Sequence, residues 1–404
     1  MAAEMNWNEK RWFSRYPELS TDPIPLEPYL SERQFELERE RIWPHVWLMM
    51  GRVEEIAEPG QYFVKDIPIC NASILVVRGK DGKVRAFHNV CSHRGNQVCW
   101  EERGAASALK CRFHGFIYDL DGALRSVPDE RMFFNLDKRA NGLTPVATDI
   151  WEGFIFINLD PHPRETLKEY LGEVGERLSG HPFHEAPRYY EYKAELRCNW
   201  KVVIYGFLEA WHVVFLHDKS AGELFGSREN PFGHNLLIKL SDKHRFISLY
   251  GNPDYQATPV GGMAFRFGKS LMQVESDTSK MLRTMNPTRS PCWSFDLNNI
   301  FPNFQLNVVN GAWYCHRFWP LAVDRTIWES RMYFPPPANA GERFFQEYSK
   351  VTTRNVLLED GSLLEKTQAV MASGAKRHWH LQDEEIAIRH FHDVVQKFVE
   401  RASV

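Results

Sequence analysis

Short β-like runs of apolar and polar residues dominate the chain from about residue 44 to residue 157. Glycine-containing turns separate them, and the pairs Asp81-Gly82 and Asp121-Gly122 have the composition of hairpin turns. This pattern predicts a mostly antiparallel β domain over residues 44–160. Its expected strands lie in YFVKDI, ASILVVRGKDGKVRAFH, FIYDLDGALRSV and GFIFINL.

A proline-rich stretch, DPIPLEPY, precedes this region and leads into the segment SERQFELERERIW. Ser31 and Gln34 fit a capping box, so a short helix is expected to begin here. We expect residues 1–43 to form an arm and a helix that pack on the C-terminal domain.

The pattern changes again after residue 160. LKEYLGEVGERL has helical periodicity and YYEYKAELR resembles a strand. A helix is expected near 199–217, strands around 236–334, and a long final helix from near Leu381. Residues 161–404 are therefore predicted to form an α+β domain, whose architecture periodicity alone does not determine.

Composition narrows the class of protein. A chain of 404 residues can hold two cores, and a net charge of −3 gives no electrostatic case for binding nucleic acid or a membrane surface. No apolar run approaches the roughly 18 residues of a membrane-spanning helix, and the start lacks the apolar region of a signal peptide. Seven cysteines, an odd and sparse set, indicate a reducing compartment, so a cytoplasmic location is expected. The 13 Trp and 27 Phe indicate either a large aromatic core or a cavity for an aromatic ligand.

Two pairs of metal-ligand residues occur within residues 91–114, CSHRGNQVCWEERGAASALKCRFH. Cys91 and His93 form one pair, and Cys111 and His114 form the other, with seventeen residues between the pairs. Two thiolates and two imidazoles suit either structural zinc or an iron–sulfur cluster with histidines on one iron. The spacing favours the iron–sulfur cluster, and zinc stays the alternative. Glycines that closely follow each histidine, Gly95 and Gly115, allow tight turns around such a cluster.

A second candidate site lies in residues 199–217, NWKVVIYGFLEAWHVVFLH. His212 and His217 are five residues apart, which separates them by about 140° on an ideal helix. They can share one ion only if the helix loosens or ends between them. Taken alone, this pair is more typical of unrelated helix histidines.

Both motifs resemble those of one family. C-x-H-R-G with seventeen residues to C-x-x-H-G resembles the Rieske [2Fe–2S] motif of the terminal oxygenases, or alpha subunits, of Rieske non-haem iron oxygenases, which include the aromatic-ring-hydroxylating enzymes. N-W-K followed by an acid-x-x-H-x4-H segment resembles the mononuclear iron segment of the same family. The resemblance implies an N-terminal all-β Rieske domain and a C-terminal helix-grip-like catalytic domain, an antiparallel sheet with helices.

The resemblance also implies ligands for the first site. Cys91 and Cys111 would hold one iron of the [2Fe–2S] cluster, and His93 and His114 the other. Histidine ligation raises the reduction potential above that of an all-cysteine cluster, which suits a centre that accepts electrons and passes them on.

For the second site, the resemblance makes His212 and His217 two ligands of a 2-His-1-carboxylate Fe(II) centre with dioxygen as co-substrate. Glu209 matches the acid that, in the family, bridges to a Rieske histidine of a neighbouring subunit. The third ligand is expected in LQDEEIAIRHFH, at Asp383, with Glu384 as the next candidate. An acidic first turn that complements the helix dipole is the alternative explanation of those residues.

The partners follow from what the chain lacks and from the resemblance. No dinucleotide-binding fingerprint is present, so electrons are expected from a ferredoxin and/or an NAD(P)H-dependent reductase. The resemblance implies a head-to-tail homotrimer, with or without a small beta subunit. No Arg or Lys pair accompanies the iron segment, so a small hydrophobic, aromatic substrate is favoured over a carboxylate.

Three functions are compared. The first is a terminal oxygenase that uses O2 and two electrons to hydroxylate, or oxidatively N- or O-dealkylate, this substrate; Glu209, where ring dioxygenases typically have Asp, favours it. The second is a cis-dihydroxylating dioxygenase of aromatic compound catabolism. The third is a non-catalytic electron-transfer or zinc-binding protein.

Overall fold

The computed structural model describes residues 11–268 and 278–400. It divides into two compact units: one runs from Ile42 to Gly172, and the other combines the chain up to Arg41 with the chain from Glu173 onward. The first of these ends beyond the predicted boundary at residue 160. Within the described ranges, no helix is both long and apolar enough to cross a membrane.

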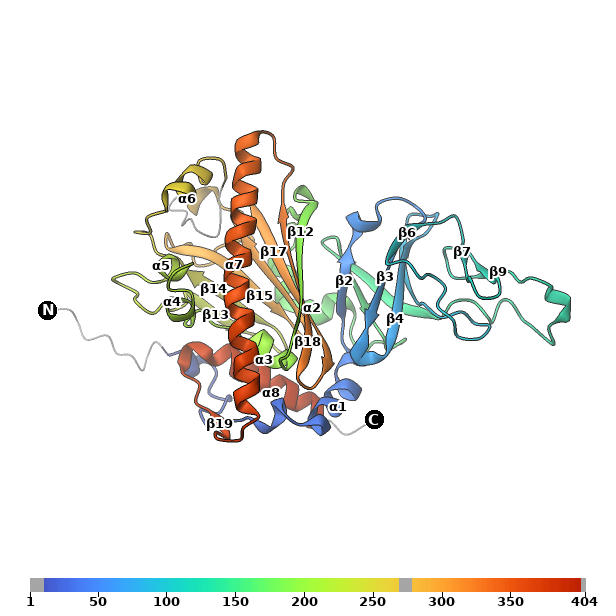
Figure 1. Cartoon of the computed structure of the whole chain (residues 1–404), viewed down its shortest axis with the longest axis horizontal. Helices are drawn as coiled ribbons and strands as arrows, with labels where there is room; N and C mark the ends of the chain where they lie inside the picture. The colour runs from blue at the N-terminus through green and yellow to red at the C-terminus, as the bar shows by residue number, and fades with distance from the viewer. Residues whose placement is uncertain (1–10, 269–277, 401–404) are drawn as a thin grey trace. The chain divides into compact units, whose positions relative to one another are not determined.

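The unit from Ile42 to Gly172 is an antiparallel β structure, as the alternating pattern predicted (Figure 1). Its seven-stranded sheet has the order β2-β11-β10-β5-β4-β3-β6, and β7-β8-β9 form a small separate sheet. The turns at Gly82 and Gly122 have positive φ values of 77° and 89°, which glycine adopts without strain. The strands are β2 (Leu48–Arg52), β3 (Gln61–Ile67), β4 (Ala72–Arg78), β5 (Val84–His88), β6 (Arg103–Ala105), β7 (Leu109–Lys110), β8 (Ile117–Tyr118), β9 (Leu124–Ser126), β10 (Pro145–Trp151) and β11 (Phe154–Asn158).

The other unit is built on a second seven-stranded antiparallel sheet, ordered β12-β18-β17-β16-β15-β14-β13. Helix α7 (Ala340–Met371) runs along this sheet (Figure 1) and buries a stripe of its residues. A mixed fold with helices on antiparallel sheets is therefore confirmed. The strands are β12 (Arg188–Leu196), β13 (Leu237–Leu240), β14 (Arg245–Tyr250), β15 (Trp293–Ile300), β16 (Phe304–Val309), β17 (Ala312–Ala322) and β18 (Arg325–Phe334).

The remaining helices are short except for the last. They are α1 (Glu32–Arg41), α2 (Leu167–Arg177), α3 (Trp200–Tyr205), α4 (Val213–Leu216), α5 (Gly222–Phe225), α6 (Pro259–Ala264) and α8 (Ile386–Glu400). Helix α2 spans the boundary between the two units and is kinked at Gly172, whose φ is 48°.

Two expectations about helices were wrong, and one helix was not predicted. The helix predicted over 199–217 is two short helices, α3 and α4, with an irregular segment between them. The final helix α8 begins at Ile386 rather than Leu381, after a 3-10 turn over Asp383–Glu385. Helix α7 was not predicted, because Thr, Asn and Gly interrupt its apolar pattern and its helical state depends on packing against the sheet.

The N-terminal arm joins the C-terminal unit through specific contacts. Strand β1 (Ile24–Pro25) pairs with β19 (His378–Trp379), and α1 packs on α8. Ser31 Oγ accepts a hydrogen bond from Gln34 N at 3.2 Å, the first half of the predicted capping box. The arm therefore shares a core with the C-terminal unit.

Glu38 of α1 lies fully buried in that core. Its carboxylate accepts hydrogen bonds from Lys201 Nζ at 2.5 Å and Trp200 Nε1 at 2.8 Å. Because both charges are buried, each is stable only with its partner.

We expect Glu38→Ala to lower the free energy of unfolding by about 3 kcal/mol, since it leaves a buried ammonium group without a counter-charge. Urea denaturation followed by circular dichroism measures this effect. Glu36→Ala is the matched control on the same helix, because Glu36 forms only an exposed pair with Arg39, and it should cost less than about 1 kcal/mol. Equal losses in the two variants would contradict the structural role of Glu38.

Candidate functional site

Two loops of the Ile42–Gly172 unit carry the predicted cysteine and histidine ligands in equivalent conformations. Gly95 N donates to Cys91 O and Gly115 N to Cys111 O, both at 3.0 Å. Both glycines have a φ of 73°, so the predicted tight turns are present. The loops thus present two similar hairpin tips, each with one thiol and one imidazole.

The thiols and imidazoles of these loops pair by type. Cys91 and Cys111 are buried in the core and interact with each other, and burial raises the pKa of Cys91. His93 Nδ1 and His114 Nδ1 face each other at 3.1 Å, nearer the surface. Two facing nitrogen lone pairs are favourable only with a proton or a metal ion between them, so the imidazole pair fits one metal. The set as a whole fits a cluster with thiolates on one iron and imidazoles on the other.

Tyr118 contacts Cys91, and sequence reasoning did not identify this neighbour. Its hydroxyl lies 3.2 Å from Cys91 Sγ and 2.8 Å from Ser92 Oγ, and accepts a hydrogen bond from Ser92 N at 3.0 Å. Burial and contact with Cys91 raise the pKa of Tyr118 to about 12, so the phenol stays protonated and can donate to the thiolate.

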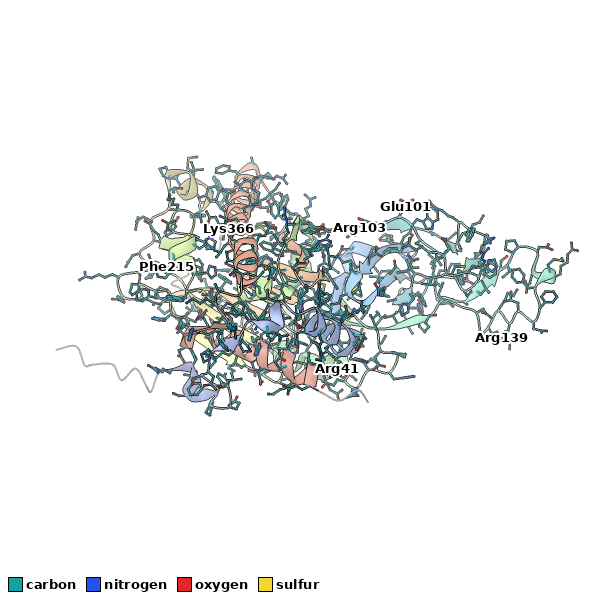
Figure 2. All side chains as sticks on the ribbon, turned by 60° about the horizontal axis from the view of Figure 1, so that its bottom comes forward. Arg41, Glu101, Arg103, Arg139, Phe215 and Lys366 are labelled. Atoms are coloured by element: carbon teal, nitrogen blue, oxygen red, sulfur yellow. The ribbon has the colours of Figure 1, made fainter. Side chains whose placement is uncertain are left out.

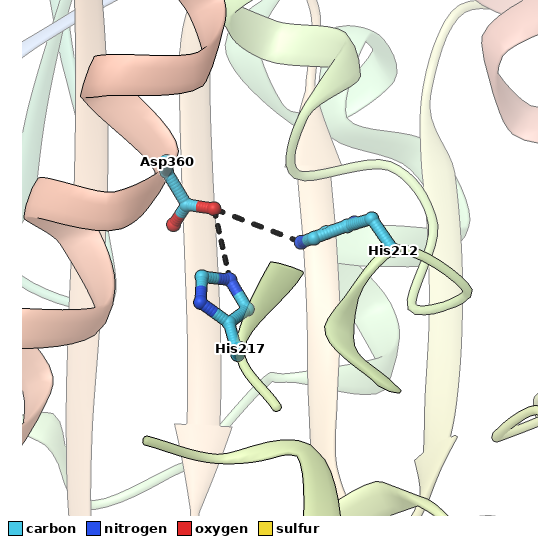
Figure 3. A group of neighbouring side chains, drawn as sticks. All are labelled: His212, His217 and Asp360. Atoms are coloured by element: carbon cyan, nitrogen blue, oxygen red, sulfur yellow. Dashed lines mark hydrogen bonds and ion pairs between the residues drawn. The ribbon is translucent and has the colours of Figure 1, made fainter. Parts of the chain in front are cut away.

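The second site lies in the C-terminal unit, around the one-turn helix α4. His212 immediately precedes this helix and His217 immediately follows it. The two imidazoles therefore converge across a helix that ends, rather than along a continuous one. His217 Nε2 lies 3.0 Å and His212 Nε2 lies 3.7 Å from the same oxygen of Asp360, on helix α7 (Figure 3).

His212, His217 and Asp360 form a group that could hold a metal ion. Their candidate ligand atoms all lie within 4.8 Å of one another. Asp360 and His217 are buried, and His212 is partly exposed. A set of two imidazoles and one carboxylate supplies three protein ligands and leaves other coordination positions for dioxygen. Such a set suits non-haem Fe(II).

The outer nitrogen of each imidazole is held by a carboxylate. Glu209 pairs with His212 Nδ1 and accepts a hydrogen bond from His212 N at 3.0 Å. Glu359 Oε2 lies 2.6 Å from His217 Nδ1. These contacts fix the tautomer that points each Nε2 at the metal position.

The carboxylates make the site favourable for positive charge. Burial opposes protonation of His212, but Glu209 and Asp360 outweigh it and raise the pKa of His212 to about 9. Burial also opposes protonation of His217. Asp360 and Glu359 outweigh burial and raise the pKa of His217. A divalent cation would satisfy the same field and displace these protons.

The prediction that Asp383 joins the histidines was wrong. Its carboxylate instead accepts hydrogen bonds from Trp12 N at 2.7 Å and Phe13 N at 3.0 Å, at the start of a short N-terminal helix. Glu384, the next candidate, accepts hydrogen bonds from Asn235 N and from Trp12 Nε1. The carboxylates of Asp383 and Glu384 therefore accept hydrogen bonds from backbone and side-chain donors in the same core.

Asp360 carries a signal that sequence reasoning missed. Thr353, Leu357, Asp360 and Leu364 follow one another at helical spacing, and all four are buried. A lone acid within a buried stripe needs a partner of opposite charge or a metal. That argument becomes available only after residues 340–371 are recognised as a helix.

A cavity of about 770 Å³, solvent at its mouth included, opens beside these ligands. It lies between α7, the α3–α5 segment and the sheet, and among its described lining residues no Arg or Lys occurs. Most of the lining is apolar, including Phe207, Val213, Leu224, Phe225, Leu249, Phe295, Leu297 and Leu357. At the nearby surface, Phe215 is 59% exposed (Figure 2).

Two family models match the chain. One is described as the ring hydroxylating alpha subunit (catalytic domain) and covers residues 183–401; the other is the Rieske [2Fe-2S] domain, over residues 46–138. Together they imply a Rieske cluster and a mononuclear iron with O2 as co-substrate, which confirms the predicted cofactors.

Similar proteins are oxygenases. The glycine betaine monooxygenase oxygenase subunit of Chromohalobacter salexigens is 33% identical over 50% of this chain and 44% of its own length. The chloroplastic choline monooxygenase of Spinacia oleracea is 32% identical over 53% of this chain and 50% of its own. The chain thus matches about half the length of these curated relatives.

Solved structures share the fold. A quaternary ammonium Rieske monooxygenase superposes with a TM-score of 0.73 and 21% identity, covering 94% of this chain and 95% of the other. Naphthalene 1,2-dioxygenase from Rhodococcus sp. superposes with a TM-score of 0.74, at the same identity and coverage.

Proposed function

Because the chain belongs to the Rieske non-haem iron oxygenases, in the family of ring-hydroxylating alpha subunits, we propose that it is the terminal oxygenase of a multicomponent system. It would insert one oxygen atom into a small, mainly apolar molecule, with hydroxylation or N- or O-dealkylation as the outcome. The observation that carries this proposal is the convergence of His212, His217 and Asp360 on one wall of an apolar cavity.

His212, His217 and Asp360 would hold the iron, with Asp360 in the place first assigned to Asp383. Iron bound there supplies the activation of dioxygen, using electrons that enter through the Rieske cluster. Glu209 and Glu359 hold the Nδ1 protons of the two imidazoles, which keeps both Nε2 lone pairs directed inward. The apolar cavity would hold an apolar substrate beside these three ligands.

Cys91 and Cys111 would hold one iron of the cluster, and His93 and His114 the other. We expect His93→Ala to lose the Rieske visible and electron paramagnetic resonance spectra, because one iron then keeps a single protein ligand. Cys99→Ser is the control, since Cys99 is a buried thiol whose pKa burial raises to about 11 and which we place outside the cluster. A Rieske-like spectrum in the His93 variant would refute the ligand assignment.

The partners remain those expected from the resemblance: a ferredoxin and/or reductase, and neighbouring copies in a head-to-tail trimer, with or without a beta subunit. Exposed apolar side chains surround the cluster histidines, which is typical of an interaction surface. Phe113 lies against His114, with ring centroids 3.8 Å apart, and is 53% exposed, while Phe134 is 97% exposed. Arg139 (Figure 2) lies with Phe134 on the segment between β9 and β10. The cytoplasmic location stays a prediction from the sequence.

The relatives' names widen the substrate class beyond aromatic molecules, because glycine betaine, carnitine and choline are quaternary ammonium compounds. Aromatic faces of Phe207, Phe225, Phe295 and Tyr314 could receive a cation. The described lining, however, offers no basic side chain to a substrate carboxylate, so we favour compounds without one.

Turnover under labelled dioxygen, with a surrogate ferredoxin and reductase, tests the function. The panel would contain N-alkyl and O-alkyl aromatics, choline, carnitine and naphthalene. We expect one labelled atom in the product, or loss of an alkyl group. Two labelled atoms in a cis-diol would make the protein a ring dioxygenase instead, and no product from any class would count against an oxygenase.

A further inference from the structure

One wall of the cavity carries polar groups that the iron site does not use. Gln305 on β16 lies directly opposite His316 on β17, and Asn307 lies opposite Tyr314. Residues two apart on a strand point to the same face, so Gln305, Tyr314 and His316 share this wall, and all three line the cavity. Cross-strand neighbours in such a pair have side chains close enough to contact one ligand group.

His316 presents a hydrogen-bond donor to the cavity. Its Nδ1 accepts a hydrogen bond from Trp328 Nε1 at 3.2 Å, and an indole N–H can only donate. The ring proton of the neutral imidazole is therefore on Nε2, for which the described residues provide no partner. Burial lowers the pKa of His316 to about 3, so the ring is neutral near pH 7.

Gln305, which also lines the cavity, carries a buried and unpaired acceptor. Its Nε2 donates to Asn307 Oδ1 at 3.3 Å, while its Oε1 is buried without a hydrogen-bond partner among the described residues. An unsatisfied buried carbonyl costs about 1–3 kcal/mol, so a ligand that donates here gains affinity. This wall also runs toward the iron ligands: Tyr314 contacts His316, with ring centroids 5.5 Å apart, and burial together with the charge of Asp360 raises the pKa of Tyr314.

We propose that His316 and Gln305 form a recognition pair for a neutral substrate group that accepts one hydrogen bond and donates another, a carboxamide or a hydroxyl. His316 Nε2–H donates to the oxygen of this group, and Gln305 Oε1 accepts its N–H or O–H. A carboxylate or a quaternary ammonium group cannot do both, because neither has a hydrogen to donate. The inference rests on the proposed function, since it specifies the substrate of the same cavity.

Equilibrium binding to the whole 404-residue chain with both metal centres filled, measured by calorimetry under anaerobic conditions, tests the pair. Benzamide and acetophenone are matched probes, because they differ only in replacing the amide nitrogen by a methyl group. We expect benzamide to bind about tenfold more tightly, the effect of one hydrogen bond to an otherwise unpaired acceptor. Benzyl alcohol against toluene gives the corresponding comparison for a hydroxyl.

Variants separate the two members of the pair. Gln305→Met keeps the approximate shape and should reduce the benzamide preference to nearly onefold. His316→Phe keeps an aromatic ring and should weaken benzamide and acetophenone together, leaving their ratio unchanged. Leu249→Val, on β14 of the same cavity, changes volume without changing hydrogen bonding, and should leave the ratio as in the parent protein.

Equal binding of benzamide and acetophenone, absence of benzamide binding, or a preference that survives Gln305→Met would overturn the recognition pair. The proposed function fails separately. Selective binding without any oxygenated product would remove the oxygenase assignment and keep the pair, whereas product formation without selectivity would remove the pair alone.

Discussion

An Asp360→Ala variant is expected to keep the Rieske spectrum while losing the mononuclear iron and product formation. Asp360 Oδ1 is the oxygen on which both imidazole Nε2 atoms converge, so its removal leaves two neutral ligands for a divalent ion. Loss of an outer carboxylate typically lowers metal affinity or activity 10–100-fold, and loss of a direct ligand should exceed about 100-fold. Iron analysis beside the cluster absorbance, with product yield, measures both effects.

Asp383→Ala is the decisive comparison, because Asp383 is the acid that sequence reasoning preferred. Its carboxylate caps the backbone at Trp12 and Phe13, so its loss should cost about 1 kcal/mol of stability and leave the iron content intact. If Asp383→Ala emptied the site and Asp360→Ala retained iron, the assignment made from the geometry would be wrong.

A Glu209→Ala variant is expected to keep both metal centres and to lose turnover by about 100-fold. Glu209 holds His212 through both the imidazole and the backbone N–H. The family resemblance predicts a further contact to a Rieske histidine of a neighbouring subunit, which would make Glu209 a positioning residue between the two centres. The rate at which dioxygen oxidises the reduced cluster in a single turnover, with substrate bound, should fall with product formation.

Glu359→Ala provides the matched control. Glu359 makes the same kind of contact with His217 Nδ1, but its side chain is 35% exposed and also accepts a hydrogen bond from Ser220 Oγ at 2.6 Å. We expect it to reduce turnover by no more than about tenfold. Normal product formation after Glu209→Ala, or equal losses in the two variants, would contradict a bridging role for Glu209.

The parts of the site that the sequence predicted are those whose members lie close together along the chain. Cys91 with His93 and Cys111 with His114 each occupy one turn, and Gly95 and Gly115 specify the conformation of those turns. The pattern of apolar and polar residues likewise predicted β3, β4, β5, β8, β9 and β11 of the Ile42–Gly172 unit, whereas β2, β6, β7 and β10 were not predicted.

Other features required the tertiary structure. Asp360 reaches His217 across 143 residues, and its helix could not be recognised locally because Thr, Asn and Gly weaken its intrinsic preference. Asp383 and Asp360 are both acids on the C-terminal helical segments, and only their neighbours distinguish a backbone cap from a metal ligand.

By itself, the sequence determined the family. It also predicted the four cluster ligands and the two iron-site histidines, because these depend on spacing within short segments. Only the tertiary structure decided that Asp360 completes the group, and that Gln305 and His316 face one cavity from paired strands. The physical reason is that long-range register and burial, rather than local preference, bring distant polar groups into contact.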